Sequence, residues 1–285
     1  MSVDPTKKLN ALLKKLRGQH AELAAPVVTP EPADEFDALV HQLVFSMLLW
    51  EASTAQARNA LKRVREAVVD YNELRVCVAD EVAQIIGEKY PLAVERAMRL
   101  RSTLNDIYQR QHAISLKHLS EGGKREARQY LDGLAGCPPY VSSRVCVVSG
   151  LGHGVPVDER LLTLLVEEQV VAEKTPVEQA ASWLTHHIKA EESLEAHLLL
   201  QAWSDEHGHP PKRDKRPVTI QVQAAEVRHD GKGDAKEPKE AGGAKGAAKG
   251  RAAEPARKPE PARKPEAARK AEPAKKAKTK PRSGS

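Results

Sequence analysis

Residues 130–162 read YLDGLAGCPPYVSSRVCVVSGLGHGVPVDERLL, and this stretch decides the fold. A predicted helix ends near Leu134, because the glycine and prolines of the turn 135–139 stop helices. The run from Val141 to Val148 is apolar enough for a buried helix or a buried strand, and periodicity does not distinguish the two. Asp158 stands directly before a further helical run, Glu159 to Val166, in the position of a helix N-cap.

Helical periodicity extends through the rest of the first 210 residues. From Ala33 onward, apolar residues recur at the i, i+3, i+4, i+7 spacing of one helix face: Phe36, Leu39, Val40, Leu43, Val44, Met47 and Leu48. Another helix is expected after Ser53 or Thr54, and a longer one from Pro91 to about His112. No alternating strand pattern with hairpin turns competes. The sequence therefore predicts an all-α body of nine or ten helices.

The last 74 residues differ in composition from this body. Residues 212–285 carry 22 Lys and Arg against 10 Asp and Glu, whereas residues 1–211 carry 23 against 29. The C-terminal segment consists mostly of Ala, Lys, Pro, Glu, Gly and Arg, and it cannot bury enough apolar surface to offset its chain entropy. We therefore expect a disordered basic tail attached to an acidic folded body.

Composition also excludes several classes of protein. The chain has no run of 18 apolar residues and no signal peptide at its N-terminus, so we expect no membrane partner and a location in the bacterial cytoplasm, at the nucleoid. The three cysteines, Cys77, Cys137 and Cys146, are too few for a disulfide framework and lack zinc spacing. We expect no metal site from protein side chains.

The stretch 130–162 resembles the helix-hairpin-helix and Gly/Pro-Asp module of the endonuclease III family of DNA glycosylases. In that family a pattern like LPGVGRKTA precedes VDTHIFRV at the 22-residue separation that here lies between Gly136 and Asp158. The resemblance extends from about Phe36 to Trp203. Within it, residues 46–54 are similar to the family's LLSAQATD segment, and Ile85-Ile86-Gly87 to its IxxIG segment.

The resemblance implies a two-lobed helix-hairpin-helix glycosylase-like fold with the following division. Residues 1–32 form an N-terminal helix and linker, residues 33–207 the helical body, and residues 208–285 the disordered basic tail. Within the body, a barrel lobe spans about 53–140 and carries the hairpin at 135–141. The second lobe joins 33–52 to 141–207, which places Asp158 at the mouth of the cleft between the lobes.

The resemblance also implies an activity: base-excision repair of DNA by a monofunctional N-glycosylase with Asp158 as the catalytic carboxylate. Breaking the bond between base and sugar builds positive charge on the sugar, which a nearby carboxylate stabilises. Family members that also nick the strand use a hairpin lysine, and the matching position here is Tyr140. Lyase activity is therefore not expected. The alternative role for Asp158 is structural, as an ordinary N-cap of the following helix.

Further residues are implied to contact DNA. They are Gly136, Cys137, Pro138 and Tyr140 in the hairpin, Lys124, Arg125, Arg128 and Arg144 in a basic patch around it, and Trp50 and Glu51 where family members fill the gap left by a flipped base. The prolines weaken the hairpin's grip on a phosphate by removing N–H donors, although its carbonyls remain available to a monovalent cation. No cysteine follows Cys146, which excludes the family's iron-sulfur cluster.

Double-stranded DNA is the expected partner, and the protein is expected to be a monomer. The tail would add salt-dependent affinity for DNA or RNA through its cations. A spacer that solubilises the chain or folds back on the acidic body is the alternative for the tail. Two other classes of function stay open: a glycosylase-like DNA-binding or nucleoid protein that has lost catalysis, and a helical protein-interaction module.

Overall fold

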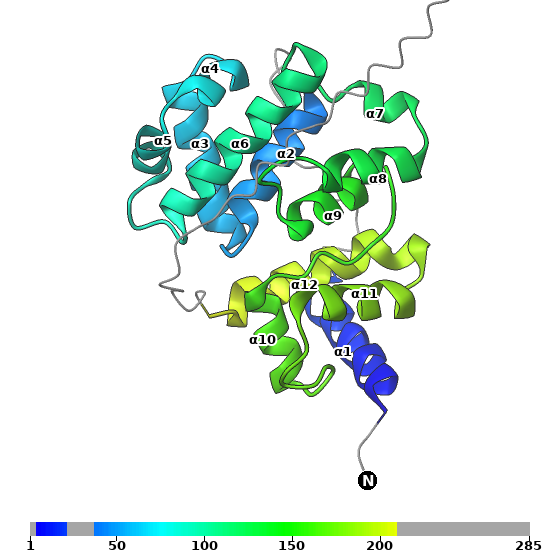
Figure 1. The fold of residues 1–285 in the computed structure, drawn as a ribbon. Coiled ribbons are helices and arrows are strands. Elements are labelled where there is room, and N and C mark those ends of the chain that lie inside the picture. Colours follow the sequence, from blue (N-terminus) through cyan, green and yellow to red (C-terminus); the bar gives the residue numbers. More distant parts are fainter. Residues whose placement is uncertain (1–3, 22–36, 210–285) are drawn as a thin grey trace, which may run out of the picture. The chain divides into compact units, whose positions relative to one another are not determined.

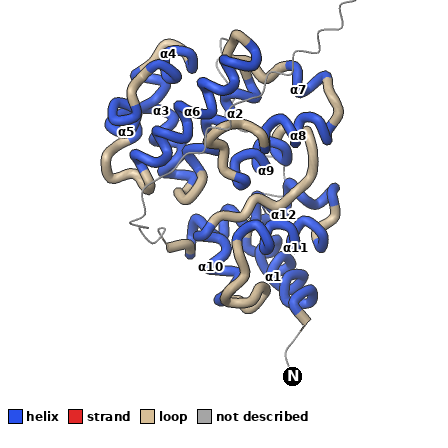
Figure 2. The backbone as a smooth tube through the Cα atoms, viewed as in Figure 1, coloured by secondary structure: helices blue, strands red, loops and turns tan. Residues whose placement is uncertain are grey.

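The computed structural model describes residues 4–21 and 37–209, which form α-helices and contain no strand (Figure 1 and Figure 2). The prediction of an all-α body is confirmed. The expected tail beyond residue 209 and the expected linker at residues 22–32 lie outside the described residues. None of the described helices combines the length and the apolar character that crossing a bilayer requires.

The described residues contain twelve α-helices and the 3-10 helix η2 (Ala190–Glu192). In chain order the α-helices are α1 (Pro5–Gln19), α2 (Ala38–Leu49), α3 (Thr54–Ala67), α4 (Tyr71–Val76), α5 (Ala79–Ile86), α6 (Ala93–Gln111), α7 (His118–Glu121), α8 (Lys124–Asp132), α9 (Pro139–Val148), α10 (Glu159–Glu167), α11 (Val177–His187) and α12 (Ser193–His207). The nine or ten expected helices become twelve, because α4 and α7 are too short to show a helical period in the sequence.

Local signals set several of these boundaries. Asp37 precedes α2, and its carboxylate accepts hydrogen bonds from the N–H groups of Leu39 and Val40. Ser53 and Gln56 form a reciprocal capping box at the start of α3. Gly87 ends α5 with a φ of 105°, which a residue without a Cβ adopts most easily. The segment 141–148, which fitted a helix or a strand, is helix α9.

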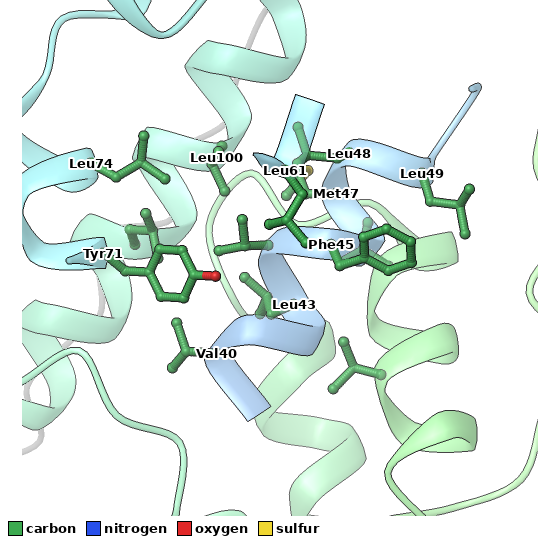
Figure 3. Packing of buried hydrophobic residues seen from close by; sticks show 14 of the residues in the cluster. Val40, Leu43, Phe45, Met47, Leu48, Leu49, Leu61, Tyr71, Leu74 and Leu100 are labelled. Carbon is green, nitrogen blue, oxygen red and sulfur yellow. The ribbon is translucent and has the colours of Figure 1, made fainter. Parts of the chain in front are cut away.

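One hydrophobic cluster, which we call the large lobe, joins α2 to α3, α4, α5, α6, α7, α8 and α9. Its centre is α2, a helix that is buried on all sides: every residue from Leu39 to Leu49 is buried. Figure 3 shows side chains of α2 gathered with those of neighbouring helices, among them Leu43, Met47, Leu48, Leu61, Leu74 and Leu100. A helix that is apolar on every face requires neighbours on every face, which α3, α6 and α9 help to supply.

A second cluster, the small lobe, joins α1 to α10, α11 and α12. Leu9, Leu12, Leu13 and Leu16 form the buried face of α1 and pack with the apolar residues of the three C-terminal helices. In Figure 1 these four helices lie together on one side of the described chain, and α2 to α9 lie on the other. Residues from both ends of the folded sequence thus share one core.

The two clusters divide the chain differently from our expectation. The segment 33–52 was expected in the second lobe, yet its helix α2 forms the centre of the large lobe, and α9 belongs there too. The N-terminal helix, expected as a separate region, is part of the small lobe. The periodicity of a helix shows which of its faces is buried but not which other helices cover that face. The sequence therefore did not determine the lobe to which each helix belongs.

Candidate functional site

A cavity of about 630 Å³ opens between elements of the two lobes. From the large lobe it is lined by Trp50 and Glu51 after α2, by Arg99, and by the hairpin between α8 and α9. From the small lobe it is lined by the segment 153–159 and by one face of α11. The hairpin residues that line it are Cys137, Pro138, Pro139 and Tyr140, and the charged residues that line it include Arg128, Asp158 and Glu159.

Asp158 lies in the wall of this cavity as the N-cap of α10. Its Oδ1 accepts a hydrogen bond of 2.9 Å from the N–H of Leu161, as a helix cap does, and its Oδ2 accepts one of 3.1 Å from the N–H of Glu51. The residue is 5% exposed. Burial raises the pKa of Asp158, whereas these two N–H donors and the charge of Arg160 favour its ionised form.

Glu51 returns the contact. Its Oε1 accepts a hydrogen bond of 2.8 Å from the N–H of Glu159. The backbone at Glu51 thus holds the carboxyl group of Asp158, and the backbone next to Asp158 holds the carboxyl group of Glu51. Glu51 is 3% exposed, and its Oε2 is buried without a hydrogen-bond partner among the described residues. Burial, and after it the negative charge of Asp158, raises the pKa of Glu51 to about 8.

The chain reaches this arrangement through a tight corner at the end of α2. Glu51 has a φ of 56°, in the left-handed region that residues with a Cβ seldom adopt. Arg96, which is fully buried on α6, holds the corner by donating hydrogen bonds to the carbonyl groups of Met47, Trp50 and Pro91. The α2 carbonyl groups at its C-terminal end would otherwise lack partners. Burial lowers the pKa of Arg96 to about 10, which leaves it charged at neutral pH.

Additional hydrogen bonds join the lobes around the corner. The N–H of Thr54 donates to Asp205 Oδ1 at 3.0 Å, and the hydroxyl of Tyr140 donates to Gln201 Oε1 at 3.0 Å. Tyr140 is buried, and burial together with the charge of Asp158 raises the pKa of its hydroxyl. The cavity wall is therefore fixed on both sides of the carboxyl pair.

The hairpin has a glycine where its geometry requires one. Gly136 has a φ of 78°, and a Cβ at this position would lie 3.0 Å from the carbonyl oxygen of Arg99. Pro138 and Pro139 then occupy the N-cap and first position of α9, where a missing N–H removes no helical hydrogen bond. Since Arg99 Nη1 lies 3.5 Å from the Gly136 carbonyl, its charge opposes the monovalent cation expected there, and that cation remains a prediction.

The structure brings most of the sequence-predicted residues together. Asp158, Trp50, Glu51, Cys137, Pro138 and Tyr140 all line the cavity. Lys124 is exposed at the start of α8. Among the described residues, no group of three or more His, Cys, Asp or Glu side chains is arranged to hold a metal ion.

The prediction for Arg144 was wrong. This arginine was expected in a surface basic patch, but it is 4% exposed, donates to Ser46 Oγ at 2.8 Å and lies over the ring of Phe45. It faces the inside of the large lobe, because the corresponding face of α9 packs on α2. Glu51 was expected at the position where family members fill the gap left by a flipped base, whereas its carboxyl group is turned toward the start of α10.

The cavity wall contains two cations, Arg128, which the sequence placed in the basic patch around the hairpin, and Arg99, which sequence reasoning missed. The guanidinium group of Arg99 lies 5.3 Å from the ring centroid of Trp50 and binds Glu95. Arg128 pairs with Asp132 one helical turn away. Arg99 looks like an ordinary surface residue of a helix in the sequence, so no local signal pointed to it.

Comparisons with known proteins concern the fold that carries this site. No protein-family model matches the sequence, and no curated protein matches it. Solved structures do match. A trapped endonuclease III–DNA covalent intermediate superposes with a TM-score of 0.53 at 15% identity, covering 71% of this chain and 86% of the other.

Two 8-oxoguanine glycosylases superpose as well. The Clostridium acetobutylicum glycosylase/lyase, solved with double-stranded DNA, gives a TM-score of 0.52 at 14% identity over 71% of this chain and 69% of the other. The Thermotoga maritima enzyme gives 0.50 at 18% identity over 72% and 100%. At these identities the likeness concerns the fold. The described part of this chain has the helix-hairpin-helix, Gly/Pro-Asp fold of the DNA glycosylases.

Proposed function

We propose that this protein is a monofunctional DNA N-glycosylase, which binds duplex DNA, admits an extruded nucleotide to the cavity and hydrolyses the bond between base and sugar. The fold alone does not establish an activity, because one fold supports several functions. The observation that carries the proposal is the carboxyl group of Asp158, at the start of α10 in the wall of a 630 Å³ cavity. A cavity of that size holds a small-molecule or nucleotide ligand.

Asp158 has the chemistry that the reaction requires. As the base leaves, positive charge develops on the sugar, and a carboxylate held close to it stabilises that charge. The N–H donors of Leu161 and Glu51 each use one oxygen of Asp158. A carboxylate has about four acceptor directions, so directions remain for the sugar or for a water molecule. The start of α10 favours the ionised form through its dipole.

Hydrolysis, and not strand cleavage, fits the cavity wall. A glycosylase that also cleaves the strand needs an amine to form a Schiff base with the sugar. The hairpin position that would supply it is Tyr140, whose hydroxyl group donates to Gln201. Among the described residues that line the cavity, none is a lysine. Water bound near Asp158 is therefore the nucleophile in this proposal.

Charge supports duplex DNA as the substrate. The cavity wall contains Arg99 and Arg128, and two of the matching structures contain DNA bound to their proteins. Residues 212–285 hold 22 cationic side chains, which add affinity that does not depend on sequence and falls with salt. A monomer that acts at the bacterial nucleoid remains our expectation.

A second function is favoured by one observation. Asp158 and Glu51 are 5% and 3% exposed and hold each other through hydrogen bonds, as residues with a purely structural role also do. A DNA-binding protein that has lost catalysis would keep this arrangement as a brace between the lobes.

Release of a base separates the two functions. The full chain is incubated with duplexes that carry alkylated, oxidised, deaminated or mismatched bases, and abasic sites are then revealed with alkali. We expect release from at least one duplex and a loss of about 100-fold or more in Asp158→Asn. Binding without any release, and with Asp158→Asn equal to the parent, would support the non-catalytic function.

A further inference from the structure

One carboxyl oxygen of Glu51, Oε2, has no hydrogen-bond partner among the described residues. The other oxygen, Oε1, accepts from the Glu159 N–H, whereas Oε2 is buried. Buried polar atoms in folded proteins nearly always have partners. Since Glu51 also lines the cavity, a ligand in the cavity is the natural source of the missing partner.

Whether Glu51 Oε2 donates or accepts a hydrogen bond depends on whether Glu51 or Asp158 carries a proton. Asp158 and Glu51 are both buried, and each carboxyl group accepts an N–H group from the chain beside the other, so a negative charge on one disfavours a negative charge on the other. The pKa of Glu51 is raised to about 8, so the pair retains one proton near neutral pH. Asp158 accepts two N–H groups and is near Arg160, whereas the carboxyl group of Glu51 accepts one N–H. The proton therefore belongs on Glu51. With Oε1 engaged as an acceptor, it resides on Oε2, which makes Oε2 a donor.

We propose that Glu51 is the general acid of this site: its Oε2–H donates to an acceptor atom of the extruded base and transfers the proton as the base leaves. The inference rests on the proposed glycosylase function. In the free protein Oε2 is covered, so the contact requires the side chain of Glu51 to turn toward the cavity that it lines when the nucleotide binds.

The step balances in protons and electrons. The O–H bond of Glu51 breaks and an N–H or O–H bond forms on the base, while the bond from C1′ to the base breaks and its electron pair leaves with the base. Water adds its oxygen to C1′, and Asp158 stabilises the positive charge in between. Both carboxyl groups are then ionised, and uptake of the proton that water releases restores the acid form of Glu51.

This assignment selects a class of substrate. A base alkylated on a ring nitrogen already carries a positive charge and leaves as a neutral molecule, so it needs no acid. A neutral purine, such as an oxidised or deaminated one, leaves far more readily when a ring nitrogen is protonated, because it then departs as a neutral molecule. The arrangement of Asp158 beside a protonated Glu51 therefore fits neutral bases with an acceptor atom in the ring.

The test compares two kinds of duplex in single-turnover reactions, with the released base measured by chromatography. One set carries the neutral bases 8-oxoguanine and hypoxanthine, and the other carries the cationic 7-methylguanine. We expect Glu51→Gln to slow release of the neutral base that the parent accepts by about 100-fold or more, since general acids contribute about 10² to 10⁴. Release of 7-methylguanine, where the parent shows it, should fall less than release of the neutral base, by a factor of about ten or more.

A pH profile supplies a readout that a purely structural role does not move. The charged groups that act on Glu51 are Asp158 and Glu159 at the start of α10 and Arg96 on α6. We expect the parent's rate on the neutral base to fall as the pH rises through about 8, the pKa of Glu51, and the variant to lose this dependence. The control Glu66→Gln removes an exposed carboxylate on α3, away from the cavity lining.

The outcomes separate the inference from the function on which it rests. No release from any duplex by the parent overturns the glycosylase function itself. Equal rates for the parent and Glu51→Gln on a neutral base, an equal loss on both kinds of base, or release of 7-methylguanine alone overturns the general acid and leaves the glycosylase intact. If the Glu51→Gln variant does not fold, the parent's profile decides: a rate that does not fall above pH 8 overturns the general acid.

Discussion

Replacing Glu51 with glutamine tests the buried carboxyl pair without any substrate. The pKa of Glu51 is about 8 in the folded protein and 4.5 in the reference state that represents the unfolded chain. Between these values the folded state holds a proton that the unfolded state has released. The stabilisation from that proton is fully present below pH 4.5 and is lost as the pH rises toward 8.

The structure sets the size of the effect. One pKa unit corresponds to about 1.4 kcal/mol, so the contribution of Glu51 to the free energy of unfolding falls by about 3 kcal/mol between pH 5 and pH 7.5. A glutamine side chain has the same shape and does not titrate, although its NH₂ group would lack an acceptor at every pH. The difference in stability between variant and parent should therefore shift in the variant's favour by about 3 kcal/mol over this range.

Urea unfolding followed by helical circular dichroism at half-unit steps of pH measures this difference. Groups away from the buried pair titrate alike in both proteins, so subtraction isolates the titration of Glu51 together with its effect on Asp158. Glu66→Gln, at an exposed position, should give a difference that stays constant with pH. Parallel curves for Glu51→Gln and the parent, within about 0.5 kcal/mol, would show that Glu51 is ionised in the folded protein and would refute the reasoning.

Three further predictions follow, two from single contacts and one from the charge of residues 212–285. Gly136→Ala should lower the free energy of unfolding by about 2 to 3 kcal/mol, because the new Cβ would meet the Arg99 carbonyl oxygen. The control Gly150→Ala, at a φ of 68° with open space around it, should lower it by only about 1 kcal/mol. Equal losses in urea unfolding would exclude a clash at the hairpin. Arg96→Met should lower stability by about 3 kcal/mol, since three carbonyl groups lose a donor, and a loss below about 1 kcal/mol by thermal unfolding would contradict this. Deletion of 212–285 should weaken DNA binding and lower the slope of log affinity against log salt by about 3 or more, and an unchanged slope would exclude phosphate contacts by that segment.

Much of the fold could be predicted from the sequence because its signals are local. The apolar repeat of α2, the turn at Gly136 and the cap position of Asp158 each depend on a few neighbouring residues. The separation of 22 residues between Gly136 and Asp158 adds a constraint between two such signals. The family resemblance that these signals carry implied Asp158 at the mouth of a cleft, and the structure has it in the wall of a cavity.

The errors concern contacts between distant segments. Helix α2 is apolar on every face, so its sequence does not show that it belongs with α3 and α6 and not with α12. Arg144 is a typical DNA-contacting residue by type, and only the packing of α9 on α2 shows that it donates to Ser46. Burial of an arginine depends on which helix covers it, which periodicity does not reveal.

Glu51 was the residue that sequence reasoning placed nearby but understood least. A glutamate after a tryptophan at a helix end looks like a surface residue, and as such it would oppose DNA. Its actual surroundings depend on the left-handed φ of 56° at the corner and on the Glu159 N–H from 108 residues away. Neither can be read from the neighbouring residues.

Binding of two analogues of the substrate tests the central claim most directly. One duplex contains a pyrrolidine nucleotide, whose ring nitrogen is cationic like the sugar during base release, and the other contains a neutral tetrahydrofuran nucleotide of the same shape. Contacts with the duplex and by residues 212–285 are common to both, so the ratio of the two affinities reports the charge in the cavity. We predict that the parent binds the cationic analogue at least about tenfold more tightly and that Asp158→Asn loses this preference. Equal affinity of the parent for both analogues would contradict the account.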